Sequence, residues 1–518
     1  MNSNQRYIYW FLIILLISST LSACLGSTAE PTVTFQATPI PTQTEVIVYT
    51  PTADVEDIRK SVLAGTWYPD HPEELSSMVD QFLEAVERVD GNPVALIVPH
   101  AGYIYSGQVA AYGFKQLEEA DIDTAIIIAS DHQPPISGPI SVWIGDGFET
   151  PLGIVPVNWE LAELIVDSNP LIHADHLPHN GEHPIEIELP FLQRVCPTCS
   201  IVPILMGKDD PDTVSALANT LSTLLIDRKA VIIASSDLSH YPSYEDARII
   251  DGATLAAIET GDLDFVTETI NALMSSGFSN LVTCACGKGP ILVAMHAAES
   301  LGANSSTVLG YLNSGDIPLG EVDRVVGYGA VMFWQYEPPN ITESDQEELL
   351  EFARKTLEAH LDGSQLPTFK TENPNLLRRS GVFVTVEQDG ELRGCIGHVR
   401  ADLPLYQAVQ DMSISAATLD PRFPPLTKEE LSTIEIEISV LSPLQRVTDN
   451  NQIEVGIHGL ILYHSDGQGL LLPQVAIEQG WDRESLLENL CLKAGLPENC
   501  WRENPSIYSF TAIVFAEE

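Results

Sequence analysis

Four segments of the chain combine the pattern of a buried strand with a side chain that can bind a metal or move a proton. ALIVP leads to His100, TAIIIASD leads to His132, and AVIIASS leads to Asp237 and His240; the fourth segment ends in CACGKGP around Cys286. In open α/β sheets, ligands and catalytic groups collect beyond the carboxyl ends of the strands. We therefore predict one polar pocket assembled from distant parts of the sequence.

The residue types in this predicted pocket favour a transition metal. We expect His100, His132 and Cys286 to be the metal ligands, because imidazoles with one thiolate suit iron or copper, or zinc, rather than magnesium or calcium. Asp237 and His240 are then expected beside the metal, as proton donors and acceptors. One such histidine alone is more often a satisfied structural residue, so the prediction depends on the repeated pattern.

Other polar residues could face the same pocket. Tyr103 follows the first histidine in PHAGYIYSG and offers a hydroxyl group to that loop. His183 and Glu186 are three residues apart at a predicted helix start, where a pocket role and a role in helix capping or solvated charge remain open. We expect surface positions for three histidines that precede them, His173, His176 and His179.

Length and charge limit the kinds of protein this can be. A chain of 518 residues is too long for one ordinary core, so two or three domains are expected. The formal net charge of -47 argues against a nucleic-acid partner, whose binding surface would be basic. The same charge also fits solubility through self-repulsion.

The N-terminal residues resemble an export signal. Arg6 precedes the apolar run 8–17, which is short for a membrane span, and LSAC then ends at Cys24. We expect residues 1–23 to be a bacterial lipoprotein signal peptide, and Cys24 to become the lipidated N-terminus on the outer face of the cell membrane. An uncleaved signal anchor is the alternative. Residues 24–56, rich in Thr and Pro, are predicted to form a tether.

The remainder divides into two predicted domains. Over residues 57–337, apolar runs alternate with amphipathic helical patterns, which predicts an α/β domain with a mainly parallel sheet. Over 345–518 the alternation is less regular, so we predict an α+β domain. Export would permit disulfides, and Cys196-Pro-Thr-Cys199 could form a local one, whereas a lone CxxC is weak evidence for zinc.

The motifs of the first domain resemble those of the Memo family. AGTWYP, VPHAGYIYSG, EHPIEIELPFL, SSDLSHY and CGKGPI occur in order over residues 57–337. The resemblance implies the fold of class III extradiol dioxygenases, with His100, His132 and Cys286 at the metal-site positions and Asp237 and His240 beside them. Two departures stand out. The family usually has Gly-Pro before a Ser-His or Asn-His pair where this chain has ASDH, and a glutamate, Glu188, stands where some members have a histidine.

The second domain resembles the AMMECR family over about 345–518. LRGCIG and DPRFPPL carry the resemblance. Arg393 could lower the pKa of Cys395 and make it a nucleophile or ligand, but a small buried thiol in a tight strand is the alternative. Asp420 and Arg422 could bind a ligand or form an ion pair that holds a turn.

The two resemblances together imply a fused member of the AmmeMemoRadiSam set, and hence a radical-SAM protein as partner. One hypothesis is a metal-dependent oxidoreductase of the extradiol dioxygenase type, in which His240 relays protons and Asp237 orients it. The alternatives are a non-catalytic module that binds metal or peptide, and a scaffold whose metal site has decayed. A thiolate differs from the carboxylate that extradiol enzymes use, and it would invite oxidation.

Overall fold

The computed structural model describes residues 57–89, 91–133, 138–318, 320–336, 338–401, 403–447, 449–464, 467–503 and 505–517. The predicted signal peptide, the tether and Cys24 lie outside these residues. Within the described part of the chain, no helix is both long enough and apolar enough to cross a membrane. We call residues 57–336 the first region and residues 338–517 the second region.

An eight-stranded mixed sheet forms the centre of the first region. Its four middle strands, β2, β9, β3 and β8, run parallel to one another, whereas β11 and β10 continue the sheet antiparallel on one side. In order across the sheet the strands are β10 (Ser305–Asn313), β11 (Gly327–Gln335), β2 (Asn92–Val98), β9 (Ala230–Ser235), β3 (Thr124–Ser130), β8 (Ser200–Met206), β4 (Ile140–Val142) and β7 (Ile172–Ala174).

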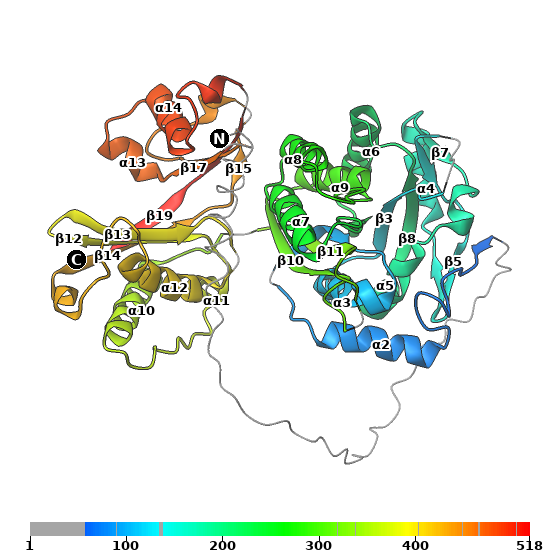
Figure 1. Ribbon diagram of the computed structural model, residues 1–518, viewed down its shortest axis with the longest axis horizontal. Helices are drawn as coiled ribbons and strands as arrows, with labels where there is room; N and C mark the ends of the chain where they lie inside the picture. The colour runs from blue at the N-terminus through cyan, green and yellow to red at the C-terminus, as the bar shows by residue number, and fades with distance from the viewer. Residues whose placement is uncertain are drawn as a thin grey trace, which may run out of the picture. The chain divides into compact units, whose positions relative to one another are not determined.

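Helices cover both faces of this sheet, which explains why its strands read as continuous apolar runs. In β3, Ile126 and Ile128 join the core on one face, and Ile127 and Ala129 join the core on the other. The first core is covered by α4 (Trp159–Ser168), α6 (Pro211–Leu224), α7 (Tyr244–Glu259), α8 (Leu263–Ser275) and α9 (Lys288–Ser300). The second is covered by α2 (Pro72–Glu84), α3 (Tyr103–Phe114) and α5 (Leu189–Val195), which lie together on the other side in Figure 1.

Side-chain caps fix where several of these helices begin. Asp210, Ser243 and Asp262 each accept a hydrogen bond from the backbone three residues later, at the starts of α6, α7 and α8. A small sheet of β1 (Ile58–Arg59), β5 (Gly147–Thr150) and β6 (Gly153–Pro156) completes the region. Its 3-10 helices are η1 (Lys115–Leu117), η2 (Pro178–Gly181) and η3 (Glu186–Glu188).

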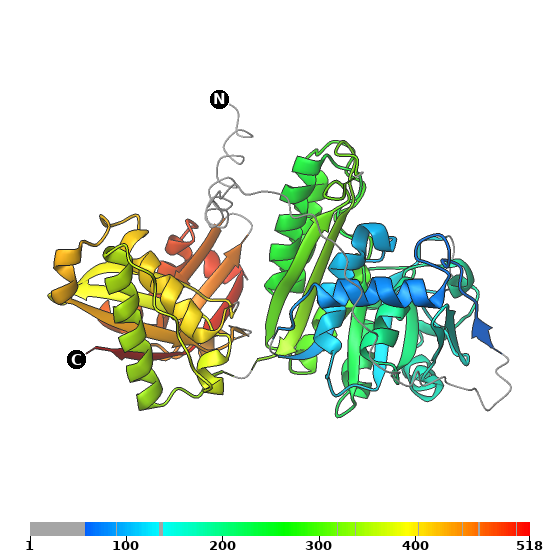
Figure 2. The same ribbon diagram turned by 90° about the horizontal axis from the view of Figure 1, so that it is seen from below.

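The second region is built on two antiparallel four-stranded sheets (Figure 2). The first consists of β13 (Glu391–His398), β12 (Val382–Gln388), β14 (Ile434–Leu441) and β19 (Ala512–Ala516), and packs against α10 (Glu343–Leu361) and α12 (Leu405–Thr418). The second consists of β15 (Gln445–Arg446), β18 (Ser506–Phe510), β16 (Gly459–His464) and β17 (Gly467–Leu471), beside α13 (Pro473–Glu478) and α14 (Arg483–Lys493). Short helices are α11 (Pro374–Leu377), η4 (Lys428–Ser432), η5 (Asn450–Gln452) and η6 (Cys500–Glu503).

The predicted fold classes are confirmed: an α/β region with a mixed, mostly parallel sheet precedes an α+β region with antiparallel sheets. Two local predictions are wrong. The segment before Cys286 is no strand, because α8 ends at Ser275 and a loop leads to α9. The apolar run at 509–515, whose sequence predicts a single strand, is divided between two strands in different sheets, because the chain changes sheets at Thr511, whose backbone bonds with Ser442.

Four cysteines form disulfides. Cys196 is bonded to Cys199, and Cys491 to Cys500, while Cys284, Cys286 and Cys395 are free among the described residues. The CxxC pair is thus a local crosslink. Such bonds form and persist in oxidising compartments.

Candidate metal centre

His100 is held at the carboxyl end of β2 by two contacts with residues at the end of β9. Its backbone N–H donates to Asp237 Oδ1 at 2.8 Å, and its Nδ1 lies 2.9 Å from Ser235 Oγ. The residue is only 2% exposed. Because Nδ1 is engaged behind the ring, Nε2 is the nitrogen that faces the neighbouring side chains.

His132 follows β3 in the same way. Its backbone N–H donates to Glu182 Oε1 at 2.7 Å, and that oxygen also accepts from the N–H of Gln133 at 2.7 Å. About a quarter of the His132 side chain is exposed (27%), so it is the ligand candidate nearest to solvent. Strands β2 and β3 both pair with β9, which explains how two histidines 32 residues apart meet at one edge.

Cys286 reaches the same edge from the loop before α9. Its backbone N–H donates to the Asp237 carbonyl at 3.2 Å, and its Sγ lies 3.2 Å from His100 Nε2. The next residue must be small: a Cβ on Gly287 would lie 2.6 Å from Ser236 Cβ. Glycine at 287 therefore lets the thiol-bearing loop pack against the end of β9.

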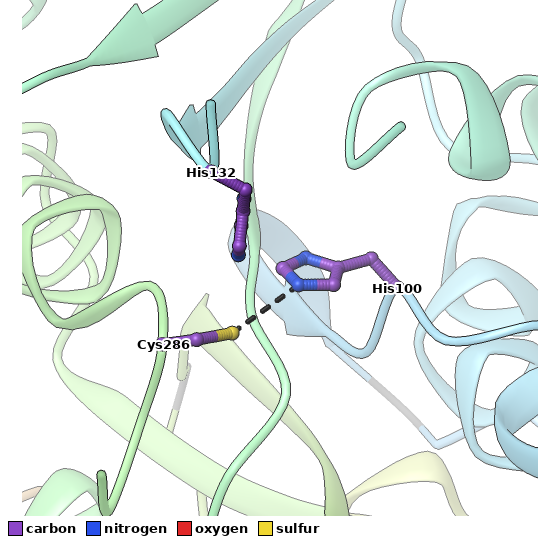
Figure 3. Close-up of side chains that lie close together, drawn as sticks. All are labelled: His100, His132 and Cys286. Atoms are coloured by element: carbon purple, nitrogen blue, oxygen red, sulfur yellow. Dashed lines mark hydrogen bonds between the residues drawn. The ribbon is translucent and has the colours of Figure 1, made fainter. Parts of the chain in front are cut away.

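The three side chains point toward one another (Figure 3). One ligand atom each from His100, His132 and Cys286 lies within 4.8 Å of the others. Burial, followed by repulsion from His183, His132 and His240, lowers the pKa of His100 well below its usual value, and burial lowers the pKa of His132. Both rings are thus neutral at pH 7 and keep a lone pair for a cation.

The thiol is in the opposite situation. Burial first, then the Asp237 charge, raises the pKa of Cys286 to about 12. A thiolate is therefore disfavoured here unless a positive charge accompanies it, which is what a bound metal ion supplies. Two neutral imidazoles and a thiol that needs a cation fit iron, copper or zinc.

His183 and Glu182 complete the wall of the pocket. The ring of His183 is centred 5.3 Å from that of His100 and 4.8 Å from that of His132, and it packs on Trp67 at 4.7 Å. Burial, then the charge of His132, lowers the pKa of His183 to about 3. The structure thus places His183 in the pocket, which is one of the two roles left open for it. The sequence offered no reason to expect its neighbour Glu182 there.

A buried chain of polar groups lies behind His100. Ser235 Oγ is 2.8 Å from Glu188 Oε1 and 2.7 Å from the Pro184 carbonyl, as well as 2.9 Å from the imidazole. Glu188 is fully buried, and burial raises its pKa well above the usual value. Glu188, which stands where some members of the family have a histidine, is therefore linked to His100 through Ser235.

Asp237 and His240 lie beside the site, and the contacts of Asp237 differ from the predicted ones. The Asp237 carboxylate accepts from the backbone of His100 and Ala101, so it shapes the His100 loop rather than orienting the His240 ring. Burial raises the pKa of Asp237 to about 7. Burial, then the charge of His132, lowers the pKa of His240 to about 4, and its Nε2 has no hydrogen-bond partner among the residues that the structure describes.

Two predicted pocket residues belong to buried networks outside the pocket. Tyr103 is 2% exposed and donates its hydroxyl to the Ile187 carbonyl at 2.8 Å. Glu186 forms a buried ion pair with Arg59 and accepts from Tyr68 Oη at 2.6 Å. Both side chains thus hold neighbouring segments together. The sequence did not show this, because the end of a strand or the start of a helix does not determine the direction in which a side chain points.

The histidines expected at the surface differ among themselves. His173 is exposed, as expected. His176 is partly covered, with its ring stacked 4.0 Å from that of Trp143, and His179 is only 1% exposed, with Nε2 3.1 Å from Ser141 Oγ. Burial lowers the pKa of His179 to about 3. The surface prediction is thus wrong for His179.

In the second region, Cys395 lies on β13 among hydrogen-bonding groups. Thr385 Oγ1 donates to its Sγ at 3.4 Å, and its backbone N–H donates to Asp420 Oδ2 at 2.9 Å. Arg422 binds Asp420 and also donates to the Cys395 carbonyl at 3.2 Å. Asp420 and Arg422 thus form the ion pair that holds their loop against β13, one of the two roles considered.

The predicted effect of Arg393 on Cys395 is wrong. Arg393 donates to Glu430 Oε1 at 2.9 Å and to the Pro424 carbonyl at 2.8 Å, so its charge is engaged elsewhere. Burial raises the pKa of Cys395, and the lowering contributions come from Thr385 and then Arg422. Residues two apart on a regular strand share a face, but the pairing of β12 with β13 shifts register at Arg393, and its side chain is held by Glu430 instead.

Comparison with known proteins identifies the class of this fold and site. Residues 59–332 match the family described as Memo-like protein, and residues 350–515 match the family described as AMMECR1. Because the first match covers just over half of the chain, the chain belongs to the Memo-like protein family, with an AMMECR1 domain fused after it.

The chain is also similar to individual proteins. A MEMO1 family protein of Methanosarcina mazei is 37% identical over 279 residues, 53% of this chain and 99% of the relative, and one from Aquifex aeolicus is 34% identical over 280 residues, with the same shares. An uncharacterized protein from Pyrococcus horikoshii, of solved structure, is 38% identical, with 34% of this chain and 94% of that chain covered and a TM-score of 0.33.

Proposed function

We propose that the Memo-like region binds one iron or copper ion through His100, His132 and Cys286, and uses it in an oxidoreductase reaction on a small or protein-derived substrate. The observation that carries this proposal is the convergence of three ligand atoms within 4.8 Å, from three segments far apart in the sequence. Zinc fits the same donor set, so the metal must be identified by analysis.

The surrounding residues suit this use of a metal. Such an ion supplies Lewis acidity and, for iron or copper, electron transfer. Ser235 and Glu188 orient His100 from behind, as outer partners of metal-binding histidines commonly do. His240 is neutral at pH 7, and its buried Nε2 has no hydrogen-bond partner in the described part of the chain, so it would accept a proton from a bound substrate.

The thiol supports a second candidate, metal binding without turnover. A sulfur ligand favours softer ions and oxidises readily, and both properties suit a binding or redox-sensing role better than repeated reactions with oxygen. Oxygen uptake by the metal-loaded protein separates the candidates, because a binding protein consumes none above the rate of the free ion.

Elemental analysis tests the metal itself. The full chain is purified in detergent without oxygen, beside the variants His132→Ala and Cys286→Ala, with His173→Ala as a control at an exposed histidine. We expect about one metal ion per chain in the parent and the control, and a loss of most of it in the other two variants. Equal metal content in all four proteins would exclude this site.

We also propose that the protein is exported and anchored by lipid at Cys24. The disulfides Cys196–Cys199 and Cys491–Cys500 support this location, because such bonds are rare in a reducing cytosol. A Cys24→Ala variant should move from the membrane fraction to the soluble exported fraction and should not incorporate labelled palmitate. Palmitate labelling of that variant would contradict the anchor.

The radical-SAM partner is a proposal based on family resemblance. Radical-SAM chemistry needs a reducing compartment, so it conflicts with the proposed export and the two disulfides. Co-purification of a radical-SAM protein with the tagged full chain would support the partner. Its absence from a preparation that retains the lipid anchor would favour a protein that acts alone.

A further inference from the structure

A second group of ligand atoms lies next to the proposed thiolate site. Glu182 Oε2 is 3.5 Å from His183 Nδ1 and 3.9 Å from His132 Nδ1. One ligand atom from each of these three residues lies within 4.8 Å of the others. This group shares His132 with the thiolate site but contains neither His100 nor Cys286.

The Glu182 carboxylate is fixed with one oxygen aimed into this group. Its Oε1 accepts from the backbone N–H groups of His132 and Gln133, each at 2.7 Å. No donor group of the described residues is hydrogen-bonded to its Oε2, although the side chain is only 2% exposed. A buried carboxylate oxygen left in this state is costly unless a cation or a proton accompanies it.

No nearby cationic side chain serves this oxygen among the described residues. Arg59 lies close by, but it donates to the backbone carbonyl of Glu182 and forms its ion pair with Glu186. The Asp131 carboxyl group also lies within hydrogen-bonding reach of Glu182; burial first, and then this contact, raise the pKa of Glu182, so a proton or a cation accompanies the pair. The carboxyl groups of Glu182 and Asp131 and the imidazoles of His132 and His183 together create an electrostatic environment that favours a bound cation.

We propose that His132, Glu182 and His183 form a second position for a divalent transition-metal ion, beside the thiolate position. Two imidazoles with one carboxylate and open coordination sites are the donor set of non-haem ferrous proteins, and they also suit manganese better than a thiolate does. This inference deepens the proposed function and rests on it, because the two positions share His132.

Sharing one histidine makes the two positions alternatives. A neutral imidazole has one nitrogen with a free lone pair, so His132 binds one ion at a time. The chain therefore holds one ion, whose position depends on its chemistry: copper and Co²⁺, which accept a sulfur ligand, at Cys286, and harder manganous ions at Glu182, while iron fits either donor set.

Removing the thiol isolates the second position for a test. Co²⁺ is titrated into the metal-free full chain, into the single variant Cys286→Ser, and into two double variants. One double variant adds Glu182→Gln to Cys286→Ser. The other adds Glu163→Gln, at an exposed glutamate, as the matched control. Near-UV absorption reports a cobalt–sulfur bond, and the titration gives the Kd. A further pair, Cys286→Ser with and without His183→Gln, covers the case in which Glu182→Gln does not fold.

We expect Cys286→Ser to bind one Co²⁺ without the sulfur band. Adding Glu182→Gln or His183→Gln should raise the Kd by at least about tenfold, and adding Glu163→Gln should leave it unchanged. Failure of Cys286→Ser to bind Co²⁺, or equal Kd values with and without Glu182 and His183, would overturn the inference. Absence of the sulfur band in the parent chain would instead contradict the proposed thiolate site, so the two failures are distinguishable.

Discussion

Each region of the chain contains one partly buried free thiol, and the two differ in their neighbours. Cys286 lies 3.2 Å from His100 Nε2, with His132 in the same group. Cys395 instead accepts a hydrogen bond from Thr385, and its backbone is held by Asp420. Burial raises the pKa of both thiols, so burial does not distinguish them. The neighbouring imidazoles make Cys286 a metal-ligand candidate.

The largest expected effect comes from exchanging each thiol for a hydroxyl. Cys286→Ser should weaken binding of copper by more than about 100-fold, because it removes a direct ligand, and outer partners alone are worth 10–100-fold. Cys395→Ser should leave the affinity unchanged. Competition with a chelator of known affinity measures both, and an equal loss in the two variants would end the distinction between the thiols.

Removing the hydroxyl behind His100 should have a smaller effect. Ser235→Ala deletes the group that lies 2.9 Å from Nδ1, so the ring loses its fixed orientation and copper affinity should fall by about 10–100-fold. Ser439→Ala is the matched control, since Ser439 is a buried serine of the second region whose hydroxyl has no hydrogen-bond partner within the described ranges. Unchanged affinity in Ser235→Ala would show that the chain behind His100 is dispensable.

The ion pair beside Cys395 should contribute to stability rather than to metal binding. Hydrogen bonds from Arg422 lower the pKa of Asp420 to about 2, below the value of about 3.9 in unfolded chains. A depressed pKa stabilises the folded state above about pH 4, and that stabilisation is lost as the pH falls toward 2. At pH 7, Asp420→Asn should lower the free energy of unfolding by about 1–2 kcal/mol, a value reduced for the exposure of Arg422.

Urea unfolding of this variant and the parent at several pH values measures the contribution. The difference between the two should shrink as the pH falls from about 4 and disappear below about pH 2, where Asp420 is protonated and, like asparagine, uncharged. A difference that stays constant with pH would assign the effect of the substitution to packing instead of to the ion pair.

The smallest expected effect concerns the reactivity of Cys395. The hydrogen bond from Thr385 favours the thiolate, so Thr385→Val should raise the pKa further and slow alkylation of Cys395 at pH 8 by about threefold. Alkylation of Cys286 in the same sample is the internal control. Faster alkylation of Cys395 would mean that exposure, and not the hydrogen bond, limits its reaction.

Strand patterns in the sequence predicted much of the metal centre, because His100 and His132 directly follow apolar runs that become neighbouring parallel strands. Cys286 was found although its segment is no strand, since its chelating side chain stands in a motif shared with a family. Ser235 could have been found by the same strand-end rule, as the last residue of β9.

Other contacts could not be predicted because they depend on tertiary placement. The orientation of Glu182 is set by backbone N–H groups 49 and 50 residues earlier in the chain. His179 stands in a polar sequence yet is buried beneath Trp143 and Ser141. The sheet change at Thr511 falls within a run, residues 506–516, in which residues that favour strands predominate, so local propensity does not mark it.

X-ray absorption at the metal edge of the copper-loaded full chain tests the central claim most directly, because it reports the atoms bound to the ion. If His100, His132 and Cys286 hold the metal, the first shell contains one sulfur and two imidazole nitrogens, and the sulfur disappears in Cys286→Ser but persists in Cys395→Ser. A first shell of nitrogen and oxygen alone in the parent protein would contradict the account.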